Sequence, residues 1–229
     1  MWEEGVQQVR KALASVRQWI RPRKTDQIPD VYIEGNIGAG KSTLLRSLED
    51  SSQHKVVQEP VEQWQDLNGY NFLDRVSNDG PRWAFPFQVL AATTLWESYR
   101  QNCGSPHIYE RSIHSTIRVF SQVHFQQGNL EPEHMAILEK MTEVLVSQNQ
   151  RPAHFVYIRT TPATAHERMR VRGRTEEAQV PLEYLQQLHD AMDQWLLSPA
   201  ETNVTVIDGD SAQEAVLHET LDVLRQLGY

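Results

Sequence analysis

The feature that most constrains this chain is the segment from Gly35 to Ser42, which fits the pattern G-x-x-x-x-G-K-[ST] at each fixed position. A strand-like run at residues 31–34 precedes it, and a helix-like run at residues 43–49 follows it. Backbone N–H groups of such a loop surround phosphate oxygens, and the helix N-terminus adds a partial positive charge. Because both flanks agree, the segment predicts a nucleotide-phosphate site rather than an ordinary glycine-rich turn with an exposed lysine.

Two side chains of this loop have chemistry of their own. The ammonium group of Lys41 can reach the β- and γ-phosphates, and the hydroxyl group of Ser42 can bind Mg²⁺. The residues that we expect to hold the phosphates are Gly35, Asn36, Ile37, Gly38, Ala39, Gly40, Lys41, Ser42 and Thr43.

Composition limits what the chain can bind. Its 229 residues suit one α/β domain, and 30 acidic against 22 basic residues give a net charge of −8. Nucleic-acid-binding proteins are usually basic overall, so we expect no nucleic-acid partner. We expect no membrane partner either, because no apolar run approaches the ~20 residues that cross a bilayer. A single cysteine, Cys103, allows no internal disulfide, which favours an intracellular protein. The cytoplasm is the favoured compartment, and mitochondria are the alternative.

The first 29 residues read as an appendage to a domain that spans residues 30–229. Apolar residues at helical spacing over residues 5–20, with several lysines and arginines, predict a basic amphipathic helix. Such a helix is typical of a mitochondrial transit peptide, but Glu3 and Glu4 do not fit that pattern. An extra helix, packed on the body or free in solution, is therefore the favoured interpretation.

Strand-like and helix-like runs alternate along the rest of the chain. Strands are expected at residues 31–34, 55–58, 107–109, 154–158 and 204–207, and longer helices at residues 83–101, 112–127, 132–149, 162–172, 181–197 and 211–227. This alternation predicts an α/β protein with a five-stranded parallel sheet and helices on both faces. The phosphate loop after the first strand then puts the active site at the carboxyl ends of the strands.

Three further motifs carry charged residues that suit phosphoryl transfer. Glu59 follows the second strand, where a carboxylate can take a proton from an attacking hydroxyl group. Glu110 ends the third strand and can hold Mg²⁺, while the neighbouring Arg111 can bind the transferred phosphoryl group. Alternating arginines before an acidic pair predict a lid that closes over phosphates, made of Arg168, Arg170, Arg172 and Arg174 followed by Glu176 and Glu177.

These motifs favour a kinase over other nucleotide-binding proteins. A GTPase would carry an Asn-Lys-x-Asp motif that reads guanine, and the sequence has none. A nucleoside monophosphate kinase, the first alternative, would need several arginines on its acceptor in place of the carboxylate of Glu59. A regulatory subunit that has lost catalysis is the second alternative, although Lys41, Glu59 and Arg111 would then serve no purpose.

The order of these motifs resembles the deoxyribonucleoside kinase family, which groups deoxycytidine, deoxyguanosine and mitochondrial thymidine kinases, the insect multisubstrate enzyme and, more distantly, herpesviral thymidine kinases. The matching segments are residues 33–43, 59–61, 64, 68–69, 82–88, 110–112 and 176–185. The resemblance implies a P-loop kinase fold and phosphoryl transfer from ATP–Mg²⁺ to the 5′-hydroxyl group of a deoxyribonucleoside, as in nucleotide salvage. It also implies a homodimer, for which the helices at residues 83–101 and 112–127 have enough apolar surface.

The resemblance implies roles for single residues at the phosphate end. Glu59 would be the general base for the 5′-hydroxyl group, and Arg111 would lie near that oxygen and the transferred phosphoryl group. Lys41 would position the triphosphate. The lid residues that grip phosphates would be Arg168, Arg172 and Arg174, and the residues that hold Mg²⁺ would be Ser42 and Glu110.

The same resemblance implies how the nucleoside base is held. Gln88 would pair with the edge of the base, and the other contacts would come from Trp64, Phe87, Ala91, Leu95, Thr116 and Phe120. The purine and cytosine enzymes of the family place an arginine and an aspartate beside the base, at positions that here correspond to Leu95 and Thr116. Because these two residues and Ala91 are neutral, thymidine or a broad range of pyrimidine nucleosides is favoured.

One position departs from the family pattern at the sugar. Glu177 would reach the sugar 3′-hydroxyl group together with a tyrosine, but Ser77 occupies the place of that tyrosine. Tyr70 lies seven residues earlier, two helical turns away on the same face if this stretch is helical. We therefore expect Tyr70, water or a shifted lid to replace the missing contact, and the sugar pocket to tolerate analogues.

Overall fold

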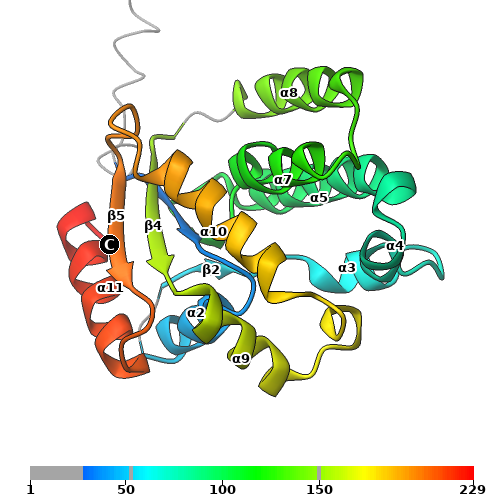
Figure 1. The fold of residues 1–229 in the computed structure, drawn as a ribbon. Helices are drawn as coiled ribbons and strands as arrows, with labels where there is room; N and C mark the ends of the chain where they lie inside the picture. The colour runs from blue at the N-terminus through cyan, green and yellow to red at the C-terminus, as the bar shows by residue number, and fades with distance from the viewer. Residues whose placement is uncertain (1–27, 52–53, 149–150) are drawn as a thin grey trace, which may run out of the picture.

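A computed structural model describes residues 28–51, 54–148 and 151–229. Its centre is a parallel five-stranded sheet in the order β2-β3-β1-β4-β5 (Figure 1). The strands are β1 (Asp30–Glu34), β2 (Val56–Val57), β3 (Ile108–Glu110), β4 (Ala153–Arg159) and β5 (Val204–Asp208). The predicted α/β class and parallel sheet are therefore confirmed, whereas the helix predicted at residues 5–20 lies outside the described residues.

Strand β1 is covered on both faces because it lies in the middle of the sheet. Successive side chains of a strand point to opposite faces. Val31 and Ile33 accordingly pack against helices α2 (Lys41–Ser51) and α11 (Gln213–Leu227), while Tyr32 belongs to the cluster formed with α10 (Leu182–Leu196). Burial of this strand fixes the position of the phosphate loop that follows it.

The remaining helices are α3 (Val61–Gln65), α4 (Phe72–Asn78), α5 (Gly80–Asn102), α6 (Ile113–Ser115), α7 (Gln122–Gln126), α8 (Pro132–Val146) and α9 (Pro162–Arg172). Figure 1 shows α5, α7 and α8 stacked beside the sheet, on the side away from α11. The short helices α3 and α4 were not predicted from the sequence. In the part of the chain that the structure describes, no helix is long and apolar enough to span a bilayer.

The stretch predicted as one helix at residues 112–127 consists of three consecutive segments. Helix α6 is followed by a π-helical segment, η2 (Thr116–Ser121), and then by α7. The hydroxyl group of Ser121 donates to the carbonyl oxygen of Thr116, five residues earlier, at 2.7 Å. Single π turns inside α-helices occur often at functional sites. Here the π segment carries Thr116 and Phe120, two residues predicted to contact a base.

Candidate active site

One cavity of about 1010 Å³ is lined by the carboxyl ends of the strands and the segments that follow them. This is where ligands bind in open α/β sheets. The predicted site residues that line it are Ile37, Gly38, Ala39, Gly40, Lys41, Ser42, Thr43, Glu59, Trp64, Phe87, Gln88, Ala91, Leu95, Glu110, Arg111, Thr116, Phe120, Arg168, Arg172, Arg174 and Glu177. Four others, Gly35, Asn36, Tyr70 and Ser77, do not line it.

The phosphate loop depends on glycine where its backbone passes another chain segment. Gly38 has φ +78°, and a Cβ atom there would lie 2.2 Å from the carbonyl oxygen of Ala165. Asn36 is buried, and its amide nitrogen donates to the carbonyl oxygen of Leu185 at 2.8 Å. The side-chain oxygen of Asn36 accepts a bond from the N–H group of Ile37 at 2.9 Å. Asn36 therefore shapes the loop from behind instead of facing the cavity.

Lys41 lies under the loop as a buried cation. Its Nζ donates to the carbonyl oxygen of Asn36 at 3.0 Å. Burial lowers the pKa of Lys41 to about 8, and the nearby Arg111 acts in the same direction, while three carboxylates raise it. An anionic ligand in the loop would favour the charged form of the lysine. Lys41 is thus suited to a polyanion such as a triphosphate.

The two residues predicted to hold a metal ion lie in contact. Ser42 Oγ donates to Glu110 Oε1 at 2.8 Å, and Glu110 is buried. Mg²⁺ takes such hard oxygen donors and usually completes its coordination with water and substrate phosphates. Within residues 28–51, 54–148 and 151–229, no group of three or more His, Cys, Asp or Glu residues could hold a metal ion. The donor set therefore fits Mg²⁺ that arrives with a nucleotide.

Glu59 and Arg111 form an ion pair in the cavity wall. Arg111 Nε donates to Glu59 Oε1 at 2.7 Å, and the guanidinium carbon lies 4.6 Å from the centre of the Phe120 ring. Arg111 has φ +67°, a left-handed conformation that is costly for a residue with a side chain. Burial alone would lower the pKa of Arg111, but Glu59 and Glu34 raise it above its ordinary value. The guanidinium group therefore keeps its charge.

Glu34 is a further charged residue behind this pair that the sequence analysis missed. It ends β1, is fully buried, and its Oε1 accepts bonds from the N–H and hydroxyl groups of Ser112 at 2.9 and 2.6 Å. Its Oε2 lies 3.9 Å from Arg111 Nη1. Burial raises the pKa of Glu34, while Arg111 and Ser112 lower it. A glutamate at the end of the central strand, directly before the phosphate loop, was the signal that could have identified it.

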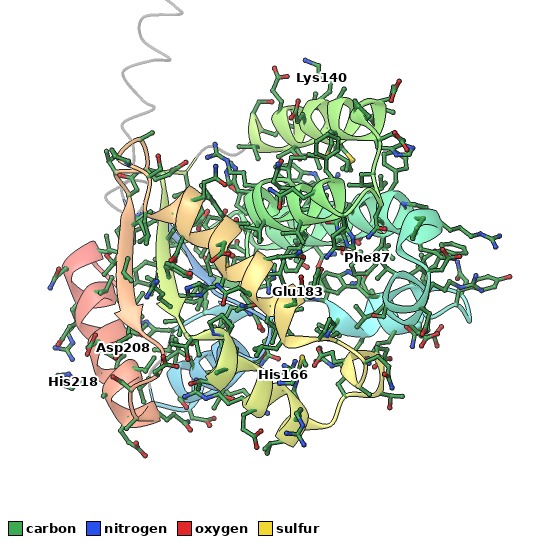
Figure 2. All side chains as sticks on the ribbon, viewed as in Figure 1. Phe87, Lys140, His166, Glu183, Asp208 and His218 are labelled. Atoms are coloured by element: carbon green, nitrogen blue, oxygen red, sulfur yellow. The ribbon has the colours of Figure 1, made fainter. Side chains whose placement is uncertain are left out.

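Aromatic and small residues of α3, α5 and η2 line another part of the cavity. The rings of Trp64 and Phe87 meet edge to face with centres 5.5 Å apart, and Trp64 Nε1 donates to Thr94 Oγ1 at 2.9 Å. Figure 2 shows Phe87 inside the helical half of the molecule. Gln88 is 1% exposed and lines the same part of the cavity. The three neutral residues predicted to lie beside the nucleobase, Ala91, Leu95 and Thr116, also line the cavity.

The two residues predicted to share the sugar site on one helix face do not share a helix. Tyr70 lies in a turn two residues before α4 begins, its side chain is 55% exposed, and its ring lies under the guanidinium group of Arg75. Ser77 is exposed on α4, and its hydroxyl group donates to the carbonyl oxygen of Leu73 at 2.9 Å. The condition for Tyr70 and Ser77 to share a helix face is therefore not met, and replacement of the family tyrosine by Tyr70, water or a shifted lid stays a prediction.

The arginines predicted as a lid lie on α9 and directly after it. Arg168 Nη1 donates to the carbonyl oxygen of Gly209 at 2.8 Å. Arg172 and Arg174 both pair with Glu177, Arg174 at 2.7 Å. Two of the predicted phosphate ligands therefore already have an anionic partner within the same segment.

The segment that carries Glu177 is tied to the opposite side of the cavity. It forms a 3₁₀ turn, η3 (Thr175–Glu177), after α9. Glu176 Oε1 accepts bonds from Gln65 Nε2 at 3.0 Å and from Asn71 Nδ2 at 2.8 Å. These contacts join the turn to α3 and to the residue before α4, so the two sides of the cavity are held together.

Comparison with known proteins identifies the relatives of this chain. The family model of the deoxynucleoside kinases matches residues 31–226. The chain belongs to the deoxynucleoside kinase family. Human mitochondrial thymidine kinase 2 is 31% identical to it over 193 residues, which cover 82% of this chain and 73% of the relative. The thymidine kinase of ictalurid herpesvirus 1 (strain Auburn) is 35% identical over 197 residues, covering 84% of each chain.

A further relative is named for a different nucleoside. The probable deoxycytidine kinase of fowlpox virus (strain NVSL) is 32% identical over 213 residues, which cover 86% of this chain and 88% of the relative. The matched family range includes the phosphate loop, the Glu59–Arg111 pair and the aromatic pocket. The chain is therefore an enzyme of phosphoryl transfer, and nucleotide binding follows from its family.

Several residues that line the cavity of this deoxynucleoside kinase were not predicted. They come from α2 and from the segment after β5, and they are Arg46, Ser47, Gly209, Ser211, Gln213, Val216 and Leu217. Gln213 Nε2 donates to Ser47 Oγ at 3.3 Å and so joins α11 to α2. These residues form no recognisable motif. For those after β5, the position behind the last strand was the available signal, since the carboxyl ends of all five strands face the site.

Proposed function

We propose that this kinase transfers the γ-phosphoryl group of ATP to the 5′-hydroxyl group of a deoxyribonucleoside, with thymidine and other pyrimidine nucleosides preferred. The observation that supports the proposal most directly is that the phosphate loop, the Glu59–Arg111 pair and the Gln88 pocket line one cavity. Single-ligand pockets usually measure roughly 300–1,000 Å³. A cavity of about 1010 Å³ is therefore large enough for a donor and an acceptor together.

In the proposed reaction one residue accepts the proton and a group of cations binds the negative charge of the phosphates. Glu59 accepts the proton of the 5′-hydroxyl group while that oxygen bonds to the γ-phosphorus. The bond from this phosphorus to the β–γ bridging oxygen breaks, which leaves a deoxynucleoside monophosphate and ADP. Lys41 and Arg111 bind the negative charge of the transferred group. Ser42 and Glu110 would hold Mg²⁺, which supplies further neutralisation of phosphate charge when bound.

The lid arginines would change partners when a nucleotide binds. Arg172 and Arg174 now pair with Glu177, and both line the cavity. Arginine pairs with phosphates in the same bidentate way as with carboxylates, and a triphosphate carries more negative charge than one carboxylate that two arginines share. We therefore expect the two arginines to bind phosphates and Glu177 to become available to the sugar 3′-hydroxyl group.

The proposed base preference depends on Gln88 and its neutral neighbours. A glutamine amide offers one donor and one acceptor side by side, which matches the N–H and carbonyl groups on the edge of thymine. Ala91, Leu95 and Thr116 add no charge to this wall. The rings of Trp64 and Phe120 are available for contact with the face of the base.

We also propose a homodimer. Ile137 and Val144 on α8 are 52% and 47% exposed, and Phe125 on α7 is 38% exposed. Figure 2 shows Lys140, which lies between the first two in sequence, on the outer side of α8. Exposed apolar side chains on one side of a helix are typical of an interface between subunits. The supporting surface thus lies mainly on α8, with Phe125 from the expected 112–127 stretch. Helix α5, which covers the other stretch expected to provide it, carries no exposed large apolar side chain among its residues, all of which the structure describes.

A substrate panel tests the proposed activity. The purified chain is incubated with ATP, Mg²⁺ and each of the four deoxynucleosides, and with thymidine monophosphate as a competing acceptor. Thymidine or deoxycytidine should be phosphorylated fastest. A protein that leaves all four deoxynucleosides unchanged, or that prefers the monophosphate, would contradict the proposal.

The role of Glu59 is tested by Glu59→Gln, which keeps the shape of the side chain but not its basicity. We expect kcat to fall by ~10²–10⁴-fold, the usual contribution of a positioned base. ATP binding, measured by calorimetry, should be unchanged. Glu97→Gln on the exposed side of α5 is the matched control and should retain full activity. An unchanged kcat in Glu59→Gln would remove Glu59 as the base.

A further inference from the structure

Two buried charged atoms beside the active site face each other without bonding. Neither Glu34 Oε2 nor Arg111 Nη1 has a hydrogen-bond partner among the described residues, and the two atoms are 3.9 Å apart. A hydrogen bond between such groups would need ~2.7–3.2 Å. A movement of the guanidinium group by about 1 Å would therefore join these two atoms, and a buried polar atom without a hydrogen bond costs free energy that such a bond would recover.

The carboxylate of Glu34 is held by Ser112, and the guanidinium group of Arg111 lies beside its second oxygen. Both Glu34 bonds to Ser112 use Oε1, so Oε2 is left facing Arg111. The backbone of Arg111 is fixed by its N–H bond to the carbonyl oxygen of Ile33 at 3.0 Å. The Arg111 side chain lies over the ring of Phe120, an apolar surface that offers no competing charge. Arg111 thus has a fixed carboxylate on one side and Glu59 on the other.

The proposed chemistry creates a need for the second carboxylate. When Glu59 accepts the proton of the 5′-hydroxyl group, it becomes neutral and no longer helps to balance the charge of Arg111. The phosphoryl group that Arg111 binds leaves with the product, so Glu34 and Glu110 are the carboxylates that remain beside Arg111. A buried cation whose anionic partner is removed is strongly destabilised. Glu34 is fully buried, lies 3.9 Å from the guanidinium group and has one free oxygen.

We propose that Glu34 is a positioning residue that takes over the Arg111 guanidinium group when Glu59 accepts the proton. The inference rests on the proposed role of Glu59 as the base. In this exchange one proton moves from the 5′-oxygen to Glu59, the bond from Arg111 Nε to Glu59 lengthens, and a bond from Arg111 Nη1 to Glu34 Oε2 forms. Glu34 acts through Arg111 and does not touch the substrate.

A matched pair of variants separates the charge of Glu34 from its shape. Glu34→Gln keeps the length of the side chain and an oxygen that can accept both bonds from Ser112, but it removes the charge. Glu34→Asp keeps the charge and loses the length. If Glu34 balances the charge of Arg111, Glu34→Gln should lower kcat by ~10- to 100-fold. This is less than the ~10²–10⁴-fold that a positioned base contributes, because Glu34 only supports the base. The KM values for ATP and the nucleoside should change less than ~3-fold, and Glu34→Asp should be the faster variant.

A purely structural role for Glu34 gives different results. Glu34→Asp would then be slower than Glu34→Gln, because it loses the contacts with Ser112, or KM would rise as much as kcat falls. Either outcome overturns the inference, and so does a kcat of Glu34→Gln within ~3-fold of the parent.

A double-mutant cycle tests whether Glu34 acts through Glu59. In a Glu59→Gln background Arg111 already depends on Glu34, so Glu34→Gln should lower kcat by a larger factor there than in the parent. Full additivity of the two losses overturns the inference. A parent enzyme that phosphorylates no deoxynucleoside would instead contradict the proposed function, so the two failures are distinguishable.

A crystal structure of the Glu59→Gln variant with a non-hydrolysable ATP analogue tests the exchange without altering Glu34. Its neutral side chain imitates the protonated base. We expect the distance from Arg111 Nη1 to Glu34 Oε2 to shorten to ~3.2 Å or less. A distance that stays at 3.9 Å, with Arg111 still bonded to residue 59, overturns the inference even if the Glu34 variants do not fold.

Discussion

Replacing Asp30 with asparagine is expected to stabilise the protein at neutral pH more than at acid pH. Asp30 begins β1, is fully buried, and accepts a bond from the N–H group of His107 at 3.2 Å. Its Oδ2 is buried and has no hydrogen-bond partner within the described part of the chain. Burial raises the pKa of Asp30 from 3.8 to about 6, although the N–H group of His107 and the charge of Arg151 act in the opposite direction.

The size of the effect follows from the two pKa values of Asp30. The folded protein holds the Asp30 proton more tightly than the unfolded chain does. Between about pH 4 and pH 6 the free energy of unfolding therefore falls as pH rises, and it stays lower above that range. A pKa raised from 3.8 to about 6 corresponds to ~3 kcal/mol of lost stability. Asparagine keeps the oxygen that accepts the His107 bond and cannot ionise, so the free energy of unfolding of the variant does not fall in this way.

Urea unfolding of the parent and of Asp30→Asn over about pH 4 to pH 8 measures the effect. The free energy of unfolding of the variant minus that of the parent should rise by ~3 kcal/mol across this range. Any cost of burying the new amide N–H group is the same at each pH and does not affect the slope. Glu139→Gln on the exposed side of α8 is the control, and its difference should change by less than ~1 kcal/mol. A difference for Asp30→Asn that is flat, or that falls with pH, would refute the reasoning.

Three further results are expected. Lys41→Ala should lower kcat by at least ~10²-fold, measured as initial rates with saturating ATP, because it removes a buried cation from the phosphate loop. Ser77→Tyr should increase the ratio of kcat/KM for thymidine to kcat/KM for its 3′-deoxy analogue by ~10-fold. A helical side chain leans toward the preceding turn, and Leu73 on that turn lines the cavity, so the new tyrosine would point toward the sugar. Tyr70→Phe should leave that ratio unchanged, and a change would show that Tyr70 reaches the sugar after all. Ile137→Glu should shift the protein toward monomers in sedimentation velocity, and an unaltered dimer would place the interface elsewhere.

The parts of this molecule that follow from local pattern could be predicted from the sequence. The phosphate loop is recognisable because its glycines and lysine occur at fixed spacing between a strand and a helix. The five strands were located to within a few residues because β-branched and apolar runs are short and separated by helical patterns. Helix α9 matches its predicted range of residues 162–172, since Pro162 begins it and Gly173 ends it in a left-handed conformation.

The contacts that complete the site could not be predicted, because they join residues far apart in the chain. Glu34 meets Ser112, and Glu176 meets Asn71, across separations of 78 and 105 residues. No periodicity links such pairs, and each forms only after the sheet and the helices have assembled. The helical condition set for Tyr70 and Ser77 is not met for a related reason, since the chain forms a turn at Tyr70.

The π-helical segment η2 has a consequence for comparison among relatives. Thr116–Ser121 is π-helical, and a π turn takes up one residue more than the α-helical turn it replaces. A homologue whose chain is α-helical throughout this stretch has to be aligned with a one-residue gap here. Without that gap, Phe120 would be matched to a side chain that points in another direction, and a change of substrate range could be attributed to the wrong amino acid.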